Sequence, residues 1–539
     1  MDGSQNVACP TGASTALFQP GQQGIHAYGI QRVLLCLKKG QTDAATGTVG
    51  PFLIEWLRQE RMMMSGLVWY RRDLRTIDCA PLALACKNND RVDACFLVSA
   101  GQWRRHGLGP NHVEYMRRSL ASLADQLAEL NIQLHVKSVD TYLDAPKAIH
   151  ELARDLACTN VHWGREHEVD EVARDKAVRS LLSESGLQVH EHDDQVVVPP
   201  GSVRTGSDTG YKVFTPYRKA WLPAARDHVA GSMHERPEPM RQPPPPPAEL
   251  PEVIPEFEGF VPMDAWPVGE VEASKTMKRF VRERGSDYGR DRDIPSVHGT
   301  SRLGAALAVG ALSPRTCIAM AWQHAERNPE AAEGLNVWIS ELAWRDFYKN
   351  VVHEFPHVCR NRAFKPETEQ VAWRDDEASF KAWCEGRTGY PIVDSAMRCL
   401  VATGWMHNRL RMVTSQFLSK HLLIDWRRGE AFFARHLIDM DFASNNGGWQ
   451  WSSSTGTDAA PYFRVFNPTT QGRRFDPDGT FIRSWIPELS DLPAREIHEP
   501  SKMTGGLWNP STYPQPIVDQ SAGRTRAIKA FADTRNAGE

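Results

Sequence analysis

The chain has 539 residues and a mass of 60.6 kDa, which exceeds what one hydrophobic core supports and indicates two or three domains. Its 41% hydrophobic and 24% charged residues are ordinary for a soluble globular protein, and no apolar run is long enough to span a membrane. The formal net charge of −3 excludes a globally basic nucleic-acid binder but leaves room for a local basic patch.

The first 61 residues show no clear periodicity and are followed abruptly by MMMSGLVWYRRDLR, where a strand pattern begins. They lack the charged, apolar and cleavage regions of a secretory signal. We expect translation to start at Met62, Met63 or Met64, and a regulatory or targeting extension is the alternative. Residues 1–61 are therefore set apart from the predicted domains.

Strand and helix patterns alternate between residues 65 and 195. Buried strands are predicted for LVWY (67–70), ACFLV (94–98), IQLHV (132–136) and the segment around VHW (161–163), and helices for 114–130 and 169–185. This alternation is typical of a parallel sheet with helices on both faces. We therefore predict a Rossmann-like α/β domain over 65–195.

Between residues 196 and 265 the pattern dissolves into Pro-rich sequence that includes RQPPPPPAELPEVIPEF. Five consecutive Pro residues fit neither a helix nor a central strand, so we predict an extended linker on the surface. From 266 to 535 the periodicity is almost entirely helical, with Ser313 placed to cap one helix and Pro314 to open it. The predicted architecture is an α/β domain, a long linker and an all-α domain.

The ten Cys residues are scattered, without a CxxC pair or a Cys/His cluster at zinc spacing. Reduced thiols in a reducing cytoplasm, and no metal site, are the expectation. Seventeen Trp residues are a surplus that favours stacking or electron transfer as the task of some of them.

The sequence GTSRLGAALAVGALSPR, which begins at Gly299, places Thr300 and Ser301 before a helix of small residues. Hydroxyls and free backbone N–H groups at a helix N-terminus can bind a phosphate. Ser and Thr are also the preferred N-cap residues, so a plain N-cap is the alternative and, for this motif alone, the more frequent case.

Two more predicted helices gather polar and aromatic residues on one face. The helix 334–351 groups Trp338, Glu341, Arg345 and Tyr348 at spacings of three and four. The helix that begins near Trp405 groups Asn408, Arg411 and Met412, with Arg409 adjacent. Both faces suit the wall of a pocket. The alternatives are an exposed Glu–Arg pair beside partly buried rings for the first helix and a solvated basic face for the second.

Residues 439–468, DMDFASNNGGWQWSSSTGTDAAPYFRVFNP, crowd two carboxylates, two Asn, a Gly pair and two Trp together. Asp439 and Asp441 repel each other and need a cation, which the helix carrying Arg411 could supply. Paired acids also suit a metal or hydrolysis, but no His or further acid lies at ligand spacing and no GxSxG motif occurs. An organic cofactor is the better interpretation.

Several long motifs then occur in the order of one family: LVWYRRDLR, TSRL, GRTGYPIVDSAMR, TGWMHNRLRM, NNGGWQWSSSTGTDAAPYFRVFNPTTQ and FIRSWIPEL. From residue 66 to the C-terminus the chain resembles the photolyase/cryptochrome flavoproteins, and among them the bacterial class I cyclobutane pyrimidine dimer photolyases. The resemblance implies an antenna domain, a helical domain that binds FAD, and light-driven repair of ultraviolet-damaged DNA.

The resemblance also implies which residues contact FAD. The matching positions are Tyr288, Thr300, Ser301, Arg302, Leu303, Gly304, Trp338, Arg411, Asp439, Met440, Asp441 and Asn445. Gly304 stands where Ser is expected, which removes one hydroxyl. Arg411 and Asp439 match an ion pair beside the flavin ring, with Asp441 as a second acid there. Asn445 matches the amide that faces flavin N5, where plant cryptochromes carry Asp.

By the same resemblance, Trp449, Trp426 and Trp383 match an electron-transfer triad that leads from the flavin to the surface and reduces oxidised FAD in light. The positions that match lesion and DNA contacts are Arg292, Glu341, Trp344, Arg345, Asn408, Arg409, Met412 and Trp451. A flipped-out dimer would take an electron from excited FADH⁻ while Glu341 steadies its radical anion. The (6-4) photolyases have His where Asn408 stands, so cyclobutane dimers are the expected substrate.

The antenna is expected to be 5,10-methenyltetrahydrofolate, with a deazaflavin second and an empty site third. His106 and Glu171 match residues of folate-binding members, whereas Asp170, Val281 and Arg282 depart from the expected contacts. The function to set against repair is a cryptochrome-like photoreceptor, which typically carries a long C-terminal tail and altered pocket residues. A flavin electron-transfer protein without DNA leaves the clustered Arg residues unexplained. We expect a cytoplasmic monomer that binds damaged DNA and no membrane.

Overall fold

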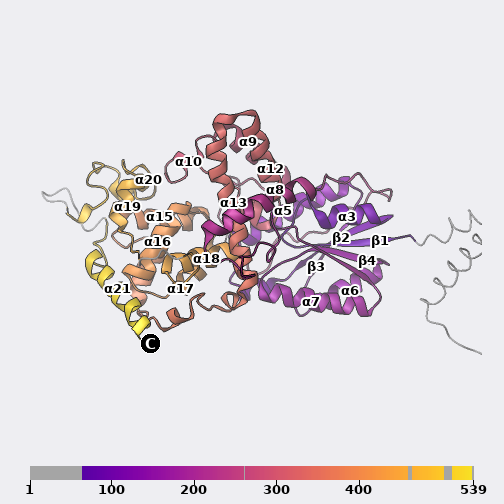
Figure 1. Cartoon of the computed structure of the whole chain (residues 1–539), viewed down its shortest axis with the longest axis horizontal. Coiled ribbons are helices and arrows are strands. Elements are labelled where there is room, and N and C mark those ends of the chain that lie inside the picture. The colour runs from indigo at the N-terminus through magenta and orange to yellow at the C-terminus, as the bar shows by residue number, and fades with distance from the viewer. Residues whose placement is uncertain (1–62, 260, 459–463, 503–512, 537–539) are drawn as a thin grey trace, which may run out of the picture. The chain divides into compact units, whose positions relative to one another are not determined.

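The computed structural model describes residues 63–259, 261–458, 464–502 and 513–536, so the predicted extension over 1–61 lies outside it. Its first part is a parallel sheet in the order β3-β2-β1-β4-β5 (Figure 1). The strands are β1 (Ser65–Tyr70), β2 (Arg91–Val98), β3 (Leu134–Ser138), β4 (Asn160–Gly164) and β5 (Gln188–His192). The predicted α/β class is confirmed. The polar edge strand β5, QVHEH, lacks the apolar run that indicated the others.

Helices cover both faces of this sheet, because its strands are apolar on both sides. They are α3 (Ala80–Asn88), α4 (Ala100–Arg105), α5 (Pro110–Glu129), α6 (Ala145–Asp155) and α7 (Val169–Glu184). Val68 and Tyr70 of β1 belong to the core with α3 and α5, and Leu67 and Trp69 to the core with α6 and α7. The first core continues without a break into the helical domain.

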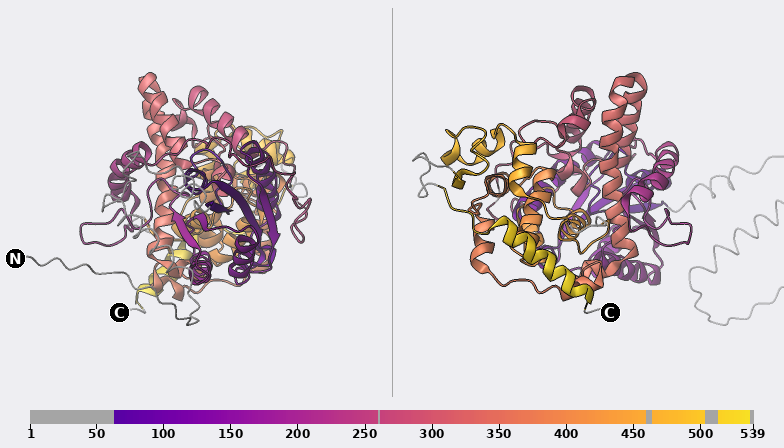
Figure 2. Two further views of the ribbon diagram at one scale, coloured as in Figure 1. Left: turned by 90° about the vertical axis from the view of Figure 1, so that its right-hand side faces the viewer. Right: turned by 60° about the vertical axis from the view of Figure 1, so that its left-hand side comes forward.

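The second part of the chain is helical, as predicted (Figure 2). Its α-helices are α9 (Gly269–Glu283), α10 (Tyr288–Asp291), α11 (Gly304–Val309), α12 (Pro314–Arg327), α13 (Ala332–Glu354), α14 (Glu377–Cys384), α15 (Pro391–Thr403), α16 (Asn408–Gln416), α17 (Trp426–His436), α18 (Phe442–Ser453), α19 (Pro468–Phe475), α20 (Thr480–Trp485) and α21 (Gln520–Asn536). Short 3₁₀ turns are η1 (Pro329–Ala331), η2 (Pro356–Arg360), η3 (Pro366–Gln370), η5 (Pro487–Leu489) and η6 (Pro500–Lys502), and η4 (Phe417–His421) is a π-helix. Ser313 caps α12 through Arg315 N and Thr316 N, as predicted. Within the described ranges, no helix is both long and apolar enough to cross a membrane.

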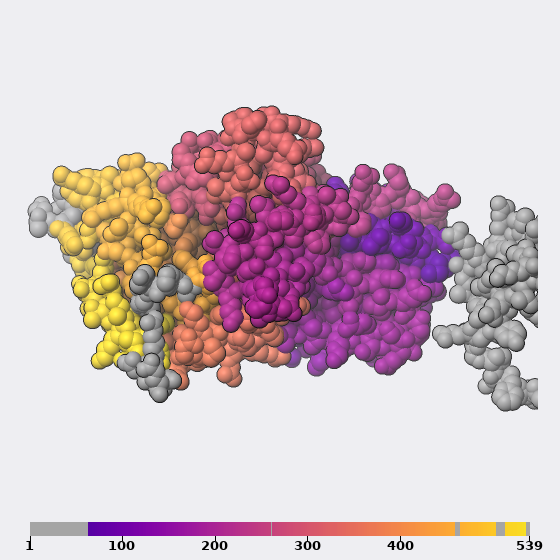
Figure 3. All heavy atoms as spheres, in the orientation of Figure 1, coloured from indigo at the N-terminus to yellow at the C-terminus, as the bar shows by residue number. Residues whose placement is uncertain are grey.

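The predicted extended linker is wrong in one respect, because it contains the helix α8 (Phe214–Gly231). Phe214, Tyr217, Trp221 and Ala225 recur at helical spacing and are buried, and Pro223 is tolerated inside the helix. Asp346 of α13 accepts hydrogen bonds from Trp221 Nε1 (2.9 Å) and from two linker backbone N–H groups. In Figure 3 the magenta residues of this linker cover the boundary between the α/β and helical residues.

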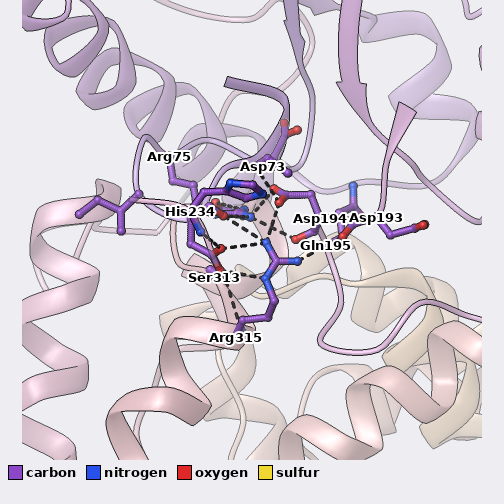
Figure 4. Close-up of polar contacts among 12 residues, drawn as sticks. Asp73, Arg75, Asp193, Asp194, Gln195, His234, Ser313 and Arg315 are labelled. Carbon is purple, nitrogen blue, oxygen red and sulfur yellow. Dashed lines mark hydrogen bonds and ion pairs between the residues drawn. The ribbon is translucent and has the colours of Figure 1, made fainter. Parts of the chain in front are cut away.

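A buried ionic cluster joins the α/β domain to the start of α12 (Figure 4). Arg315 donates from Nε to Asp78 Oδ2 (3.0 Å) and from Nη2 to Asp194 Oδ1 (2.8 Å). Arg75 also pairs with Asp194, and Ser313 Oγ donates to Asp78. The four charged side chains are at most 3% exposed. The cluster therefore holds three separate chain segments together out of contact with water.

Replacing Arg315 by Met should lower the free energy of unfolding by about 3–5 kcal/mol, because it leaves Asp78 and Asp194 short of a positive partner in the interior. Chemical denaturation monitored by Trp fluorescence measures the change. Arg290→Met is the control, since the Arg290 side chain is 70% exposed and its ion pairs are screened by water. Equal effects of the two substitutions would contradict a stabilising role of the cluster.

His162 of β4 sets a pH dependence of stability. It is 1% exposed and stacks between His190 (4.5 Å between ring centroids) and His192 (5.5 Å). Burial and the two neighbouring imidazoles lower the pKa of His162 to about 3. The unfolded chain takes up a proton on this residue near pH 6.5, which the folded protein does not, so acid favours unfolding.

Between about pH 6 and 4, the free energy of unfolding of His162→Asn should therefore fall less steeply than that of the wild type, by up to about 1.4 kcal/mol per pH unit. Denaturant titrations at several pH values give both slopes. Parallel slopes would mean that the folded protein protonates His162 as readily as the unfolded chain does.

Candidate functional site

The loop before α11 has the features of an anion site. Leu303 occupies the N-cap position without a side-chain cap, so the plain N-cap alternative for Thr300 and Ser301 is wrong. In the described part of the chain, neither hydroxyl has a hydrogen-bond partner and Arg302 has no carboxylate partner. Arg302 has a φ of 55° and lies 4.7 Å from the ring of Trp405. Burial, together with the nearby charge of Arg284, lowers the pKa of Arg302. This uncompensated positive charge beside two free hydroxyls fits the diphosphate of FAD.

Gly304 allows a close approach between α11 and Asp439. A Cβ at this position would lie 2.8 Å from Asp439 Oδ2, so a serine here would require the carboxylate to move. Asp439 instead accepts from Arg411 Nη2 at 2.8 and 3.0 Å, and Arg411 Nε donates to the carbonyl of Met406 (2.8 Å). The predicted Arg411–Asp439 pair is therefore present, with its carboxylate against the first residue of α11.

Asp441 has a different partner from the one expected. Its carboxylate accepts from Ser444 N (2.9 Å) as the N-cap of α18, and lies 3.0 Å from Lys349 Nζ. Burial would raise the pKa of Asp441, but Lys349 and other cations lower it far below its usual range. The expectation that Arg411 neutralises both acids is corrected: Lys349, which the sequence did not single out, serves the second one.

Asn445, Gly447 and Gly448 lie on α18, where this helix meets other elements. Asn445 Nδ2 donates to the carbonyl of Glu430 (3.2 Å), which leaves its carbonyl oxygen as the group available to a ligand. A Cβ at Gly447 would lie 2.1 Å from the ring of Tyr348, so this glycine is needed for packing against α13. A Cβ at Gly448 would meet no described atom within 4 Å, so protein packing does not explain the second glycine.

The aromatic residues predicted for the flavin site lie around Phe280 of α9. Trp338 is 5.3 Å and Tyr288 5.8 Å from Phe280 between ring centroids, and the two are 3% and 7% exposed. Met440 is buried between Asp439 and Asp441 in the chain. The structure thus groups Trp338 with Tyr288 and Gly304 with Asp439 and Arg411. The contacts of all these residues with FAD stay predictions.

The predicted Trp triad is only partly supported by the geometry. Trp449 lies 6.0 Å from Trp383 between ring centroids, and its indole packs on Gly429 of α17, the helix that Trp426 opens. Among the described residues, the indole N–H groups of Trp449 and Trp426 have no acceptor, whereas buried Trp usually has one. Trp383 is 0% exposed, so its prediction as the surface end of the triad is wrong.

Trp373 is the better surface end. It is partly exposed and packs against the same core cluster as Trp426. The next residue, Arg374, donates to the carbonyls of Leu423 (2.7 Å) and Leu422 (3.1 Å), just before Trp426. The sequence signal was available: Trp373 precedes a charged run, RDDE, whereas Trp383 lies on an amphipathic helix whose apolar face is buried.

Several predicted lesion residues meet at an open cavity of about 490 Å³ between α13 and neighbouring segments. Its lining residues are Arg218, Arg292, Glu333, Asn336, Val337, Ser340, Glu341 and Trp344. Arg292 Nη1 lies 2.6 Å from Glu341 Oε1, and burial raises the pKa of Glu341 while Arg292 opposes the shift. Trp344 stacks on Phe214 at 3.6 Å, so one face of its ring is covered. In the protein without DNA, the carboxylate of Glu341, which is predicted to contact a lesion, is therefore paired with Arg292.

The other predicted lesion residues divide into two groups. Arg409 pairs with Asp293 (2.8 Å), next to Arg292, while Asn408 is exposed and Met412 and Trp451 are partly exposed. Their lesion contacts stay predictions. The guanidinium of Arg345 donates to the carbonyls of Gln195 and Leu307 and therefore holds the end of the α/β domain against the helical domain, while its lesion contact also stays a prediction.

Three comparisons with known proteins bear on this arrangement. Residues 66–245 match DNA photolyase and residues 338–533 match the FAD binding domain of DNA photolyase. The deoxyribodipyrimidine photo-lyase of Escherichia coli is 42% identical over 485 residues, which cover 88% of this chain and 99% of the relative. The chain belongs to the DNA photolyase family. The Vibrio cholerae deoxyribodipyrimidine photo-lyase is 43% identical over 86% of this chain and 98% of its own. The crystal structure of a class III photolyase from Agrobacterium tumefaciens has a TM-score of 0.76 and 32% identity, over 92% of this chain and 100% of that one.

The residues predicted for the antenna of this photolyase-family chain lie together. His106 lies 3.2 Å from Asp170 and 3.5 Å from Glu171, with Tyr142 against its ring. Val281 and Arg282, which depart from the expected contacts, are a buried core residue and a surface residue of α9 that pairs with Glu283. Arg360, which the sequence did not indicate, lies 3.6 Å from Asp170, so a residue of the helical domain also lies beside these antenna candidates.

A second cavity lies at the carboxyl ends of the strands, where open parallel sheets usually bind ligands. Its volume is only about 40 Å³, and Trp69, Arg71, Trp103 and Tyr142 are among its lining residues. Arg71, another lining residue, lies 4.4 Å from the ring of Trp69.

Proposed function

We propose that the protein repairs cyclobutane pyrimidine dimers in ultraviolet-damaged DNA, as a light-driven carbon–carbon lyase that binds FAD in its helical domain. The observation that carries the proposal is the Arg292–Glu341 pair beside Trp344 in an open cavity. The relatives named deoxyribodipyrimidine photo-lyase, at 42% and 43% identity over nearly their whole length, support it. Bound FAD would supply, in its reduced and light-excited form, the electron that opens the cyclobutane ring and would then take it back.

The chain's own residues hold the substrate and its charge. A dimer must leave the duplex to enter the cavity. Its damaged stacking lowers the free energy of flipping it out to about a few kcal/mol, and photolyases are a known example of such base flipping. Trp344 and Trp451 would stack against the flipped bases, and Arg292 and Arg409 would bind phosphates or the lesion. Burial raises the pKa of Glu341 while its ion pair with Arg292 opposes the shift, so release of Arg292 by an entering dimer would favour the protonated carboxyl, which can donate a hydrogen bond to a dimer carbonyl.

The test uses purified protein with reduced FAD and an oligonucleotide that contains one dimer. Loss of the dimer is measured in blue light and in darkness. Loss in light alone supports the lyase. A protein whose FAD is reduced in light but that restores no dimer would overturn it in favour of a cryptochrome-like photoreceptor.

Glu341→Ala should lower the number of dimers repaired per absorbed photon by roughly tenfold, equivalent to about 1.4 kcal/mol at the reacting state. Glu341→Gln retains a hydrogen-bond donor and should keep most of the repair. Dimer affinity should change less than repair in both variants, because the proposed bond strengthens only when the dimer carries negative charge. Quantum yield and dimer binding are measured side by side; an unchanged yield in Glu341→Ala would remove this role.

For the antenna we propose 5,10-methenyltetrahydrofolate at His106, Asp170, Glu171 and Arg360. The proximity of these four residues supports it. Adding the folate to purified protein should produce an excitation band that sensitises repair. Glu171→Gln should weaken that binding, whereas a response of the wild type to a deazaflavin alone would overturn the assignment.

A further inference from the structure

Lys349 is a fully buried cation that the proposed chemistry does not use. It lies on α13, the helix of Trp338, Glu341 and Trp344, and is 0% exposed. Its Nζ lies 2.8 Å from Glu168 Oε1 and 3.0 Å from Asp441 Oδ2. Glu168 is the residue before α7 in the α/β domain, and Asp441 is the residue before α18. One ammonium group thus joins the starts of two helices from different domains.

On one side, Lys349 fixes the first turn of α18. Its partner Asp441 accepts from Ser444 N through the carboxylate and from Asn445 N through the backbone carbonyl, both at 2.9 Å. Asp439, two residues earlier, is bound to Arg411. The position of Asn445 relative to the Arg411–Asp439 pair therefore depends on where Lys349 holds Asp441.

On the other side, Lys349 connects to the antenna residues. Arg72 lies 3.6 Å from Glu168 and 3.9 Å from Glu171, and Glu171 lies 3.5 Å from His106. Each acid in this series is at most 9% exposed. The ion pairs thus run without a break from His106 to the N-terminus of α18.

The electrostatic balance of this series depends on Lys349. Asp441 and Glu168 are held ionised by it, since burial alone would raise the pKa of each and the ammonium lowers both. Without the ammonium, two carboxylates would face each other in the interior, where screening by water is weak. They would separate or take up protons, and the first turn of α18 would move with Asp441.

We propose that Lys349 is a positioning residue of the flavin site, which holds Asp441 so that Asn445 and the Arg411–Asp439 pair keep the geometry and charge that favour reduced FAD. The proposal rests on the proposed FAD site. It assigns to Lys349 a share in setting the ratio of reduced to oxidised flavin, and not only a share in stability.

The test measures the midpoint potential of FAD in the purified, FAD-loaded protein, in darkness and without DNA. Lys349→Met leaves an excess of negative charge and should lower the ratio of reduced to oxidised FAD at least about tenfold at a fixed applied potential, which is about 30 mV for a two-electron couple. Asp441→Asn removes a negative charge and should change the ratio in the opposite direction. Lys349→Arg should lie near the wild type.

Lys381→Met is the matched control, because the Lys381 side chain is 70% exposed and, among the residues that the structure describes, pairs only with Glu385. A folded, FAD-bound Lys349→Met protein with a lower melting temperature and an unchanged potential would overturn the proposal and leave a merely structural role. If Lys349→Met does not fold, Asp441→Asn decides: a potential equal to that of the wild type would overturn it. Since neither light nor DNA enters the measurement, absence of dimer repair would count against the function and not against this assignment.

Discussion

Replacing Trp373 by Phe is expected to slow the light-driven reduction of oxidised FAD by about a hundredfold, equivalent to roughly 2.7 kcal/mol in an activation barrier. An electron donor in solution can approach only an indole that reaches the surface. Trp373 is partly exposed and packs against the core cluster that contains Trp426, whereas Trp426 and Trp449 are 0% and 2% exposed. Loss of the exposed indole leaves the buried pair without a route to the donor. The bleaching of oxidised FAD under blue light, with a thiol or amine donor present, gives the rate.

The matched variant is Trp383→Phe, which removes an indole from the same cluster but not from the surface. It should leave that rate within about twofold, a change of less than roughly 0.5 kcal/mol. Both variants should repair dimers normally once FAD has been reduced chemically, because repair does not use this route. A slow Trp383→Phe beside a normal Trp373→Phe would return the surface end to Trp383.

Replacing Trp451 by Ala is expected to weaken binding to dimer-containing DNA by roughly 5- to 150-fold, since stacking of one base on an aromatic side chain contributes about 1–3 kcal/mol. Trp451 lies on α18 two residues after Trp449 and is partly exposed, so it points away from the buried Trp pair. Trp344 has one ring face covered by Phe214, which leaves only one face for a base. Competition between damaged and undamaged duplexes measures the loss of selectivity.

Trp485→Ala is the control for this measurement, because Trp485 is a partly buried residue at the rim of the same core cluster, on α20. It should leave selectivity for the dimer unchanged. Affinity for undamaged DNA should fall with salt in every variant, because phosphate contacts release counterions. Loss of dimer selectivity in both Trp variants would show that a general loosening of the cluster, and not stacking, is responsible.

The spacing of apolar residues predicted most of the fold, because it shows which face of each strand or helix is buried. Apolar runs located four strands, and periods of three and four located α13 and α16. The sequence pattern failed for two elements. The strand β5 is polar because it lies at the edge of the sheet, and α8 lies in a Pro-rich segment where it is held by a hydrogen bond between Trp221 and Asp346. The contact that secures α8 joins residues 125 positions apart, and β5 is recognised as a strand only through its pairing with β4.

The candidate site, too, was predicted only in part. The Arg411–Asp439 pair follows from charges on two predicted helices and is present. The partner of Asp441 could not be predicted from the sequence. Lys349 lies 92 positions earlier, and it does not belong to the polar and aromatic face that was predicted for its helix. Matching motifs also misplaced the end of the Trp triad, since a motif does not record exposure: Trp383 lies on the buried face of an amphipathic helix, whereas Trp373 is partly exposed before a charged run.

The ionic cluster of Asp78, Asp194, Arg75 and Arg315 has a consequence for engineering. Domain boundaries usually allow modules to be exchanged, since few contacts cross them. Here four buried charges, contributed by three segments, neutralise one another across the boundary. A chimera that takes its α/β domain from a relative with another charge pattern would bury an unpaired ion. The α/β domain can therefore be exchanged only together with the matching Arg and Asp residues.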